Sequence, residues 1–249
     1  MNITILRYET IDSTNTEAAK QARLGATEGL CIIAREQTSG RGRHGRTWVS
    51  DMGAGLYFSI VLRPKLETKF LSLITLMTGI AVYDSLNEVG IKPDIKWVND
   101  IHVGEKKISG ILAETVETPT GLAVVVGIGL NLTSKNFPDE IADTATSIAA
   151  SVSGTVATSK LEAGITRYIA YWYDILDGEN GPAGILENWH KRSSYFTGKP
   201  VRVTLDGGTF IGITDGLEEN GALRVKTDGG SVKIVQAGDV ERLREVSPR

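Results

Sequence analysis

The sequence predicts an α+β fold, in which a large, mainly antiparallel sheet carries packed helices and a small β-barrel follows at the C-terminal end. Three observations predict it. Strand-like segments succeed one another through hairpin-length links, which is typical of antiparallel pairing. Long helical segments are interspersed with these strands. The stretch 198–249 changes character, because it holds 9 of the 28 glycines and short β-branched runs separated by turn pairs.

Composition excludes several classes of protein. The 249 residues are 41% apolar and 23% charged, with a net charge of −3, so we expect neither a disordered chain nor a basic protein that coats nucleic acid. The single cysteine, Cys31, lies in an apolar run and predicts a buried thiol in a reducing compartment. No secretory signal opens the chain, and the uncharged stretch 70–83 is shorter than the roughly 20 residues that span a membrane. We therefore expect a cytoplasmic protein without a membrane partner.

The N-terminal part reads as alternating strands and helices. The segment 2–8 alternates like a strand, and Thr14-Asn15-Thr16-Glu17 predicts a capping box for a helix that ends at Gly25. Further strands are expected over 29–35, 55–62, 94–97, 101–103, 108–117 and 122–131, with a long apolar helix over about 67–90.

Two helices, over about 160–177 and 182–192, lead to the C-terminal part, and the second starts with Pro182 in its first turn. Four or five short strands are then expected, over 200–205, 209–214, 222–227 and 231–235, with 240–243 as the fifth candidate, and they predict an SH3-like barrel. We expect two domains, 1–192 and 198–249.

The segment 35–48 is the most basic part of the chain, with four arginines and one acidic residue. Its core is Gly40-Arg41-Gly42-Arg43-His44-Gly45-Arg46-Thr47-Trp48. Glycines let the backbone approach a ligand, and arginine forks match carboxylate and phosphate oxygens, so the pattern favours anion binding. It has neither Walker nor Rossmann spacing. A flexible surface loop or an arginine-glycine RNA contact remains an alternative, and Trp48 could be a core residue.

Two further clusters carry candidate chemistry. Lys96-Trp97-Val98-Asn99-Asp100, followed by Lys107, combines a lysine, an amide and a carboxylate, which suit a nucleoside triphosphate with magnesium. The alternatives are an Asn-Asp turn and an exposed hairpin lysine. Gly127-Ile128-Gly129-Leu130-Asn131 puts two glycines in an apolar strand, which indicates either a close approach to the backbone or a bulge.

Together these clusters resemble the motifs of biotin protein ligases. The segments 40–48, 96–101, 107–112 and 127–131 are similar to the family's glycine-arginine loop, Lys-Trp-Pro-Asn-Asp motif, lysine-to-Gly-Ile-Leu strand and Gly-x-Gly-x-Asn motif. Asp12-Ser13-Thr14-Asn15 and Ala145-Thr146-Ser147-Ile148 also fit. Val98 departs from the usual proline but removes no functional group. The resemblance implies a catalytic domain similar to class II aminoacyl-tRNA synthetases, followed by an SH3-like domain.

The resemblance implies that biotin and ATP, with Mg²⁺, form biotinyl-5′-AMP and release pyrophosphate, after which biotin passes to a lysine of a biotin carboxyl carrier protein. A homodimer is also expected. The implied biotin site comprises Ser13, Thr14, Gln37, Gly40, Arg41, Gly42, Arg43, Lys107, Gly110, Ile111, Gly127 and Gly129. The implied ATP site comprises Arg43, Arg46, Trp48, Lys96, Asn99, Asp100 and Asn131.

The resemblance implies that the catalytic residues are Arg41, Arg43 and Lys107, which would hold the biotin carboxylate and the α-phosphate of ATP. Asp100 is the candidate magnesium ligand. An arginine of the C-terminal domain, Arg242 or Arg244, would approach the nucleotide.

Two other functions compete with this one. Lipoate or octanoate attachment enzymes share the scaffold but usually carry a different arginine-glycine signature. An RNA-binding module would leave 96–100 and Lys107 unexplained. Because the first strand begins by Ile3, we expect no N-terminal DNA-binding domain, no nucleic-acid partner and a monofunctional ligase.

Overall fold

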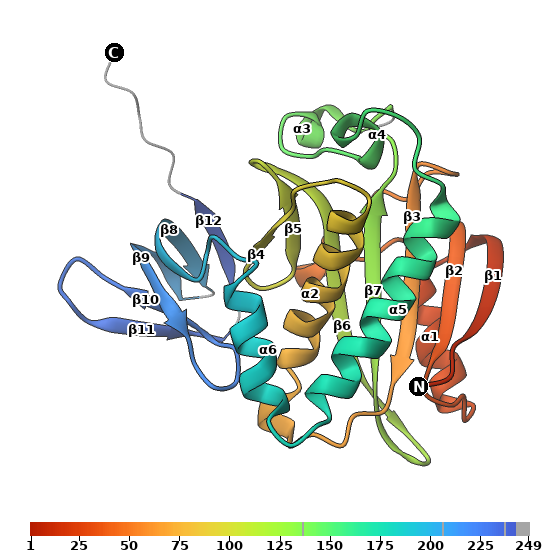
Figure 1. Cartoon of the computed structure of the whole chain (residues 1–249), viewed down its shortest axis with the longest axis horizontal. Helices are drawn as coiled ribbons and strands as arrows, with labels where there is room; N and C mark the ends of the chain where they lie inside the picture. Colours follow the sequence, from red (N-terminus) through yellow and green to blue (C-terminus); the bar gives the residue numbers. More distant parts are fainter. Residues whose placement is uncertain (136, 206, 237, 243–249) are drawn as a thin grey trace.

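The structure is a computed structural model that describes residues 1–242 except 136, 206 and 237 (Figure 1). Its larger part contains, in chain order, β1 (Thr4–Ile11), α1 (Thr14–Arg23), β2 (Leu30–Gln37), β3 (Gly55–Leu62), α2 (Leu73–Glu88), β4 (Asp94–Lys96), β5 (Asp100–Val103), β6 (Lys106–Thr118), β7 (Gly121–Asn131), α3 (Asp139–Ala142), α4 (Ile148–Ser151), α5 (Thr158–Leu176) and α6 (Gly181–His190).

The seven strands form one sheet in the order β1-β2-β3-β7-β6-β5-β4. β1 and β2 are parallel, because α1 carries the chain back between them, and each of the other neighbouring pairs is antiparallel. This confirms the predicted mixed, largely antiparallel sheet of an α+β fold.

Both faces of the sheet are covered, which explains why its central strands are almost continuously apolar. Alternate residues of a strand point to opposite faces. Ile32 and Val61 join a cluster with Ala18 and Ala22 of α1, whereas Ile33 belongs to the larger cluster under α2 and α5. Figure 1 shows α2, α5 and α6 on one face and α1 on the other. Cys31 lies in this larger core, fully buried, and burial raises the pKa of its thiol to about 12.

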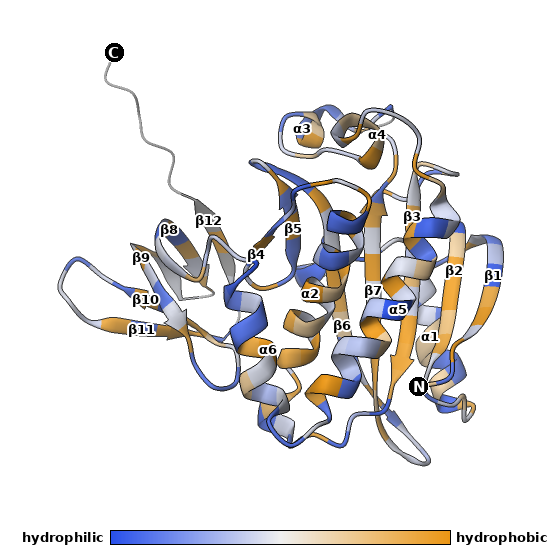
Figure 2. Cartoon of the chain, in the orientation of Figure 1, coloured by the Kyte–Doolittle hydropathy of each residue, from blue (hydrophilic) through white to orange (hydrophobic). Residues whose placement is uncertain are grey.

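The long apolar helix is shorter than predicted, since a separate 3-10 turn (Thr68–Phe70) precedes α2. The stretch Thr68–Glu88 is long and apolar enough to cross a membrane by length and composition, with a mean hydropathy of 1.3. Its residues are mostly buried against the sheet, α5 and α6, and the hydropathy colours in Figure 2 mark much of α2 as hydrophobic. This burial is what a core helix shows.

The predicted capping box at the start of α1 is wrong. Ser13 is the N-cap residue, and its side chain makes no capping hydrogen bond. Thr14 already lies inside the helix, where its hydroxyl contacts Gln37 Oε1 at 3.0 Å. The Glu17 carboxylate accepts hydrogen bonds from Gln21 Nε2 and Lys20 Nζ, and not from the backbone N–H of the N-cap residue. A partner distant in sequence therefore outcompetes the local cap.

The C-terminal part is a five-stranded antiparallel sheet in the order β11-β10-β9-β8-β12. Its strands are β8 (Thr197–Leu205), β9 (Gly208–Leu217), β10 (Leu223–Lys226), β11 (Val232–Val235) and β12 (Asp239–Arg242). The four predicted strands are therefore present, and so is the fifth, which the sequence left open.

This sheet is packed firmly against the larger part. The Trp97 indole donates to the carbonyl of Gly221 at 2.9 Å, and Ser72 Oγ donates to the carbonyl of Asn220. Gly221 has φ +81°, and a Cβ there would lie 2.7 Å from Leu76, so only glycine fits this contact. Buried residues of the two sheets belong to one continuous cluster.

Candidate active site

A cavity of about 310 Å³ lies between the start of α1, the loop that follows β2, and the strands β6 and β7. Each predicted biotin- or ATP-site residue except Gly40 and Lys96 lines it. Gly40 lies just behind the lining, where a Cβ would be 2.3 Å from the carbonyl oxygen of Trp48. Lys96 is on β4, opposite Asp100 in the strand register, and its contact with ATP stays a prediction.

One wall of the cavity is a polar chain that begins at Gln37. The Gln37 amide oxygen accepts from the backbone N–H of Thr14 at 2.9 Å, and its Nε2 donates to Ser50 Oγ at 2.8 Å. Ser50 Oγ in turn donates to the carbonyl of Trp48. Because Ser50 uses its proton there, the orientation of the Gln37 amide is fixed by its neighbours.

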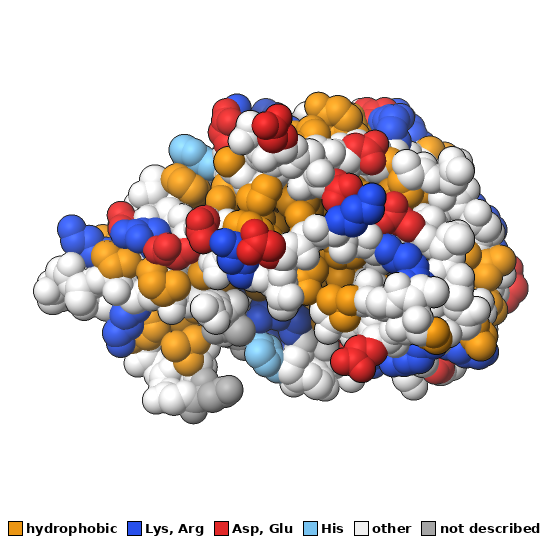
Figure 3. Space-filling view, turned by 90° about the horizontal axis from the view of Figure 1, so that it is seen from below, with side chains coloured by type: hydrophobic (Ala, Val, Ile, Leu, Met, Phe, Trp, Pro, Cys, Tyr) orange, Lys and Arg blue, Asp and Glu red, His pale blue; other side chains and the backbone are white. Residues whose placement is uncertain are grey.

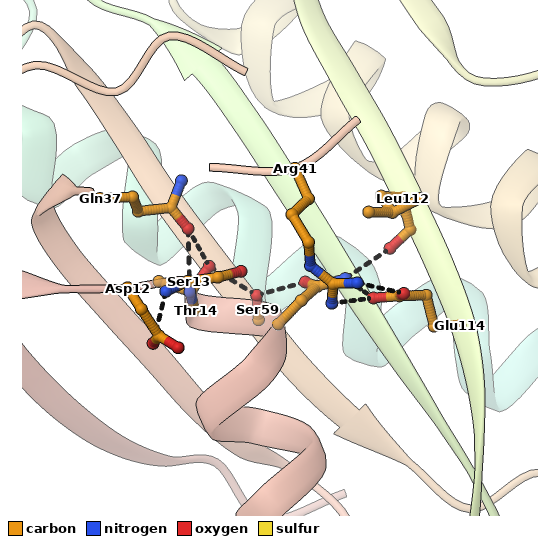
Figure 4. A network of polar contacts seen from close by, with 9 residues as sticks. Asp12, Ser13, Thr14, Gln37, Arg41, Ser59, Leu112 and Glu114 are labelled. Atoms are coloured by element: carbon orange, nitrogen blue, oxygen red, sulfur yellow. Dashed lines mark hydrogen bonds and ion pairs between the residues drawn. The ribbon is translucent and has the colours of Figure 1, made fainter. Parts of the chain in front are cut away.

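The chain continues through Ser59, which the sequence did not single out, to Asn15 (Figure 4). The Ser59 hydroxyl lies 2.8 Å from Thr14 Oγ1 and 2.6 Å from Asn15 Oδ1, and Asn15 Nδ2 donates to Glu114 Oε2 at 2.8 Å. Ser59 and Asn15 are buried. Ser59 could have been recognised in the sequence, because it is a polar residue in the middle of the apolar strand 55–62. Asn15 belongs to the motif Asp12-Ser13-Thr14-Asn15.

The loop 40–48, called the basic loop below, is held against this wall by charge-assisted contacts. Arg41 makes a two-armed pair with Glu114, with Nη1–Oε1 and Nη2–Oε2 distances of 2.9 and 2.7 Å. Arg43 Nη1 donates to Asn99 Oδ1 at 3.0 Å. Within the loop, Gly42 N–H donates to the carbonyl of Arg46 at 2.7 Å. Arg41, Arg43 and Arg46 all line the cavity.

Lys107 brings another cation to the cavity. Its Nζ lies 2.7 Å from Asp100 Oδ1 and 5.3 Å from the centre of the Trp48 ring. Its backbone pairs with Ala145, so the segment before α4 borders the site. Asn131 reaches the same segment, since its Nδ2 donates to the carbonyl of Thr146 at 2.9 Å.

The two glycines in β7 serve close approach, and the bulge alternative is wrong. β7 pairs with β3 and β6 through 127–131 without a register shift. A Cβ on Gly129 would lie 2.3 Å from Trp48 Cε2, and a Cβ on Gly127 would lie 2.1 Å from Asn15 Oδ1. Gly110 on β6 similarly leaves room for Trp48, at 2.9 Å. The glycines thus form a slot that receives an indole ring and an amide.

Trp48 lies in this slot with its Nε1 buried and, within the described part of the chain, without a hydrogen-bond partner. His102 on β5 is also buried, next to Asp100 and Lys107 in the sheet. Burial lowers the pKa of His102 to about 4, and the charge of Lys96 acts in the same direction. His102 is therefore neutral at pH 7 and adds no positive charge to the site.

The donor set suits magnesium only if a ligand contributes to its coordination. Among the described residues, no three His, Cys, Asp or Glu side chains come together. Asp100 and Asn99 supply hard oxygen atoms at the cavity, and magnesium is often held by one or two carboxylates together with substrate phosphates. The Arg242 side chain and all of Arg244 lie outside the described residues, so their predicted approach to the nucleotide is not addressed by the structure.

Comparison with known proteins identifies the family. Residues 8–131 match the biotin/lipoate A/B protein ligase family, and residues 196–243 match the biotin protein ligase C-terminal domain. The chain is 33% identical to the bifunctional ligase/repressor BirA of Bacillus subtilis, in an alignment covering 95% of this chain and 73% of that protein. It is 32% identical to the biotin--[acetyl-CoA-carboxylase] ligase of Paracoccus denitrificans, covering 92% and 96% of the two chains.

A solved structure of biotin protein ligase from Aquifex aeolicus, in complex with biotin and ATP, superposes with a TM-score of 0.84. It is 28% identical in sequence, and the match covers 96% of this chain and 99% of that one. Fold, domain matches and relatives agree, and this chain belongs to the biotin protein ligase family.

Proposed function

We propose that this protein is a biotin protein ligase that condenses biotin with ATP, releases pyrophosphate, and transfers the biotinyl group to a lysine of a biotin carboxyl carrier protein. The observation that carries the proposal is the convergence of Arg41, Arg43 and Lys107 on one cavity that is also lined by the neutral polar chain from Gln37 to Asn15. Such a cavity suits a ligand with a neutral hydrogen-bonding end and an anionic end.

The chemistry explains why cations are needed. In the first step a biotin carboxylate oxygen attacks the α-phosphorus, and pyrophosphate leaves. Two unit charges about 4 Å apart repel by about 1 kcal/mol in water and about 4 kcal/mol at an effective dielectric of about 20. Arg41, Arg43 and Lys107 offset this repulsion and align the reacting atoms, so positioning and charge stabilisation supply the acceleration.

The second step needs no covalent bond to the protein. The acceptor lysine amine attacks the acyl carbon of biotinyl-5′-AMP, AMP leaves, and an amide forms. Asp100 and Asn99 would hold magnesium together with the phosphates, and the ion would supply further neutralisation of the triphosphate. Arg46 binds the outer phosphates, Trp48 stacks on adenine, and Asn131 bonds the edge of the base. Ser13, Thr14 and Gln37 bond the biotin ring system, against walls made by Gly110, Ile111, Gly127 and Gly129.

The wider assignments follow from the same function. Residues 1–192 form the catalytic domain and residues 198–249 the SH3-like domain. The protein acts in the cytoplasm on a biotin carboxyl carrier protein, as a homodimer, without a nucleic-acid or membrane partner. On the face seen in Figure 3, acidic, basic and apolar side chains are interspersed, which supports a surface without a continuous basic field for nucleic acid.

Labelling of a carrier domain tests the function. The full chain is incubated with ATP, magnesium, biotin and an apo carrier domain, and the intact mass of the carrier is measured. We expect an increase of one biotinyl group, abolished when the acceptor lysine is replaced by arginine. Attachment of lipoyl or octanoyl groups, without biotin attachment, would favour the alternative enzyme class on this scaffold.

A further inference from the structure

Glu114 occupies an unusual place beside the cavity, because one carboxylate holds two parts of its wall. Oε1 accepts from Arg41 Nη1, and Oε2 accepts from both Arg41 Nη2 and Asn15 Nδ2. Arg41 belongs to the basic loop, Asn15 to the first turn of α1, and Glu114 to β6, so three segments distant in sequence meet at one side chain (Figure 4).

The way Glu114 holds Arg41 leaves part of the guanidinium available. A guanidinium has five N–H donors arranged as forks in one plane. Glu114 takes the end-on fork, formed by one hydrogen of Nη1 and one of Nη2. The second fork, formed by Nε–H and the other Nη2 hydrogen, has no partner among the described residues, and it matches a carboxylate or phosphate equally well.

We infer that Glu114 is a positioning residue, which fixes Arg41 by one fork so that the other is presented to the anionic group of the substrate in the cavity. The inference rests on the proposed function, in which that group is the biotin carboxylate. The Arg41 side chain is 44% exposed, and nothing else in the described structure bonds its guanidinium. Without Glu114, a long side chain at such exposure samples many rotamers, and binding the anion must then order it.

Glu114 could also affect ligand binding through Asn15, which donates to its Oε2. The contacts of Asn15 indicate that this effect is smaller than the effect through Arg41. Asn15 keeps other partners if Glu114 is changed, since Nδ2 also donates to the carbonyl of Leu112 at 3.2 Å and Oδ1 lies 2.6 Å from Ser59 Oγ. Asn15 is also buried against the glycine slot at Gly127. Arg41 has no other hydrogen-bond partner in the described structure. Replacing Glu114 should therefore weaken the binding of the anionic end of the ligand.

The two routes are separated by comparing biotin with biotinol, the alcohol that lacks the carboxylate. Dissociation constants for both are measured by calorimetry on the full chain, for wild type and Glu114→Gln, together with kcat and the biotin KM of pyrophosphate exchange. We expect biotin to bind about tenfold more weakly to Glu114→Gln, the order expected for one lost charge-assisted hydrogen bond. Biotinol should bind within about twofold of wild type, and KM should change more than kcat.

Matched variants keep the test decisive. Glu117→Gln removes a carboxylate from the same strand at an exposed position and should change neither affinity. Arg41→Ala should reproduce the selective loss of biotin, and adding Glu114→Gln to it should cost nothing more. Equal weakening of biotin and biotinol by Glu114→Gln, or no weakening of either, overturns the inference while leaving the ligase function intact. A wild-type protein without biotin-dependent exchange refutes the function itself.

Discussion

Replacing Gly129 by alanine tests the slot that holds Trp48. Gly129 has an ordinary strand conformation, so alanine can adopt its backbone angles, and the effect of the methyl group is steric. The new Cβ would lie 2.3, 2.4 and 2.7 Å from three atoms of the Trp48 ring. Carbon atoms in contact prefer about 3.5–4.0 Å, so the ring must retreat by at least about 1 Å.

The indole moves rather than the strand, because β7 is hydrogen-bonded on both sides at the centre of the sheet and Trp48 belongs to the partly exposed loop. If Trp48 stacks on adenine, we expect kcat/KM for ATP to fall about 100-fold, the scale of a 1 Å misplacement in an active site. The free energy of unfolding should fall by about 1 kcal/mol, at the lower end of overpacking.

Biotin-dependent pyrophosphate exchange at varied ATP gives the rate constants, and urea unfolding gives the stability. Gly184→Ala on α6 is the matched control, since its Cβ would meet nothing closer than 3.5 Å and should leave exchange unchanged. The Gly129→Ala effect should vanish in a Trp48→Ala background, because the clash is then removed. A Gly129→Ala enzyme with wild-type kcat/KM for ATP would refute the assignment of Trp48 to the nucleotide.

Three further predictions concern the loop and the sheet beside it. Arg43→Gly removes a cation and the contact with Asn99, so biotinyl-5′-AMP should leave prematurely from a folded protein; retention of the adenylate in rapid filtration would count against this role. Amide hydrogen exchange over 37–48 should be fast without ligands and slowed by biotin plus ATP, because these turns are largely exposed; equally slow exchange in both states would contradict a closing loop. Burial lowers the pKa of His102 from the ordinary 6.5 to about 4 in the folded protein. Between these two pH values the unfolded chain therefore binds the imidazole proton and the folded protein does not. Stability should therefore fall as pH drops from 6.5 and level off below about 4, by at most about 3 kcal/mol, and His102→Gln should flatten this part of the urea-unfolding profile.

The sequence was sufficient for the elements whose pattern is decided locally. Period-two alternation, hairpin-length links and turn glycines predicted where most strands lie along the chain and that most of them pair antiparallel, and most bounds differ from the structure by a few residues. The site residues were found for a different reason. Glycines and arginines in 40–48 and 127–131 are costly or unusual in ordinary loops and strands, so their clustering pointed to a ligand. The resemblance to biotin protein ligases supplied the individual positions, and 16 of these 18 line the cavity.

What local patterns missed is the part that depends on contacts distant in sequence. Thr14 looked like a helix cap because its true partner, Gln37, lies 23 positions away. Glu114 was given no role, since nothing nearby in the sequence indicates that Arg41 and Asn15 converge on it. The short helices α3 and α4 were missed as well, because four-residue segments carry too little periodicity to be recognised.

The most direct test of the whole account is biotin-dependent exchange of labelled pyrophosphate into ATP by the purified protein in the presence of magnesium. The account predicts exchange that requires biotin and is lost when Lys107 is replaced by alanine. No exchange with biotin, but exchange with lipoate or octanoate, would contradict it.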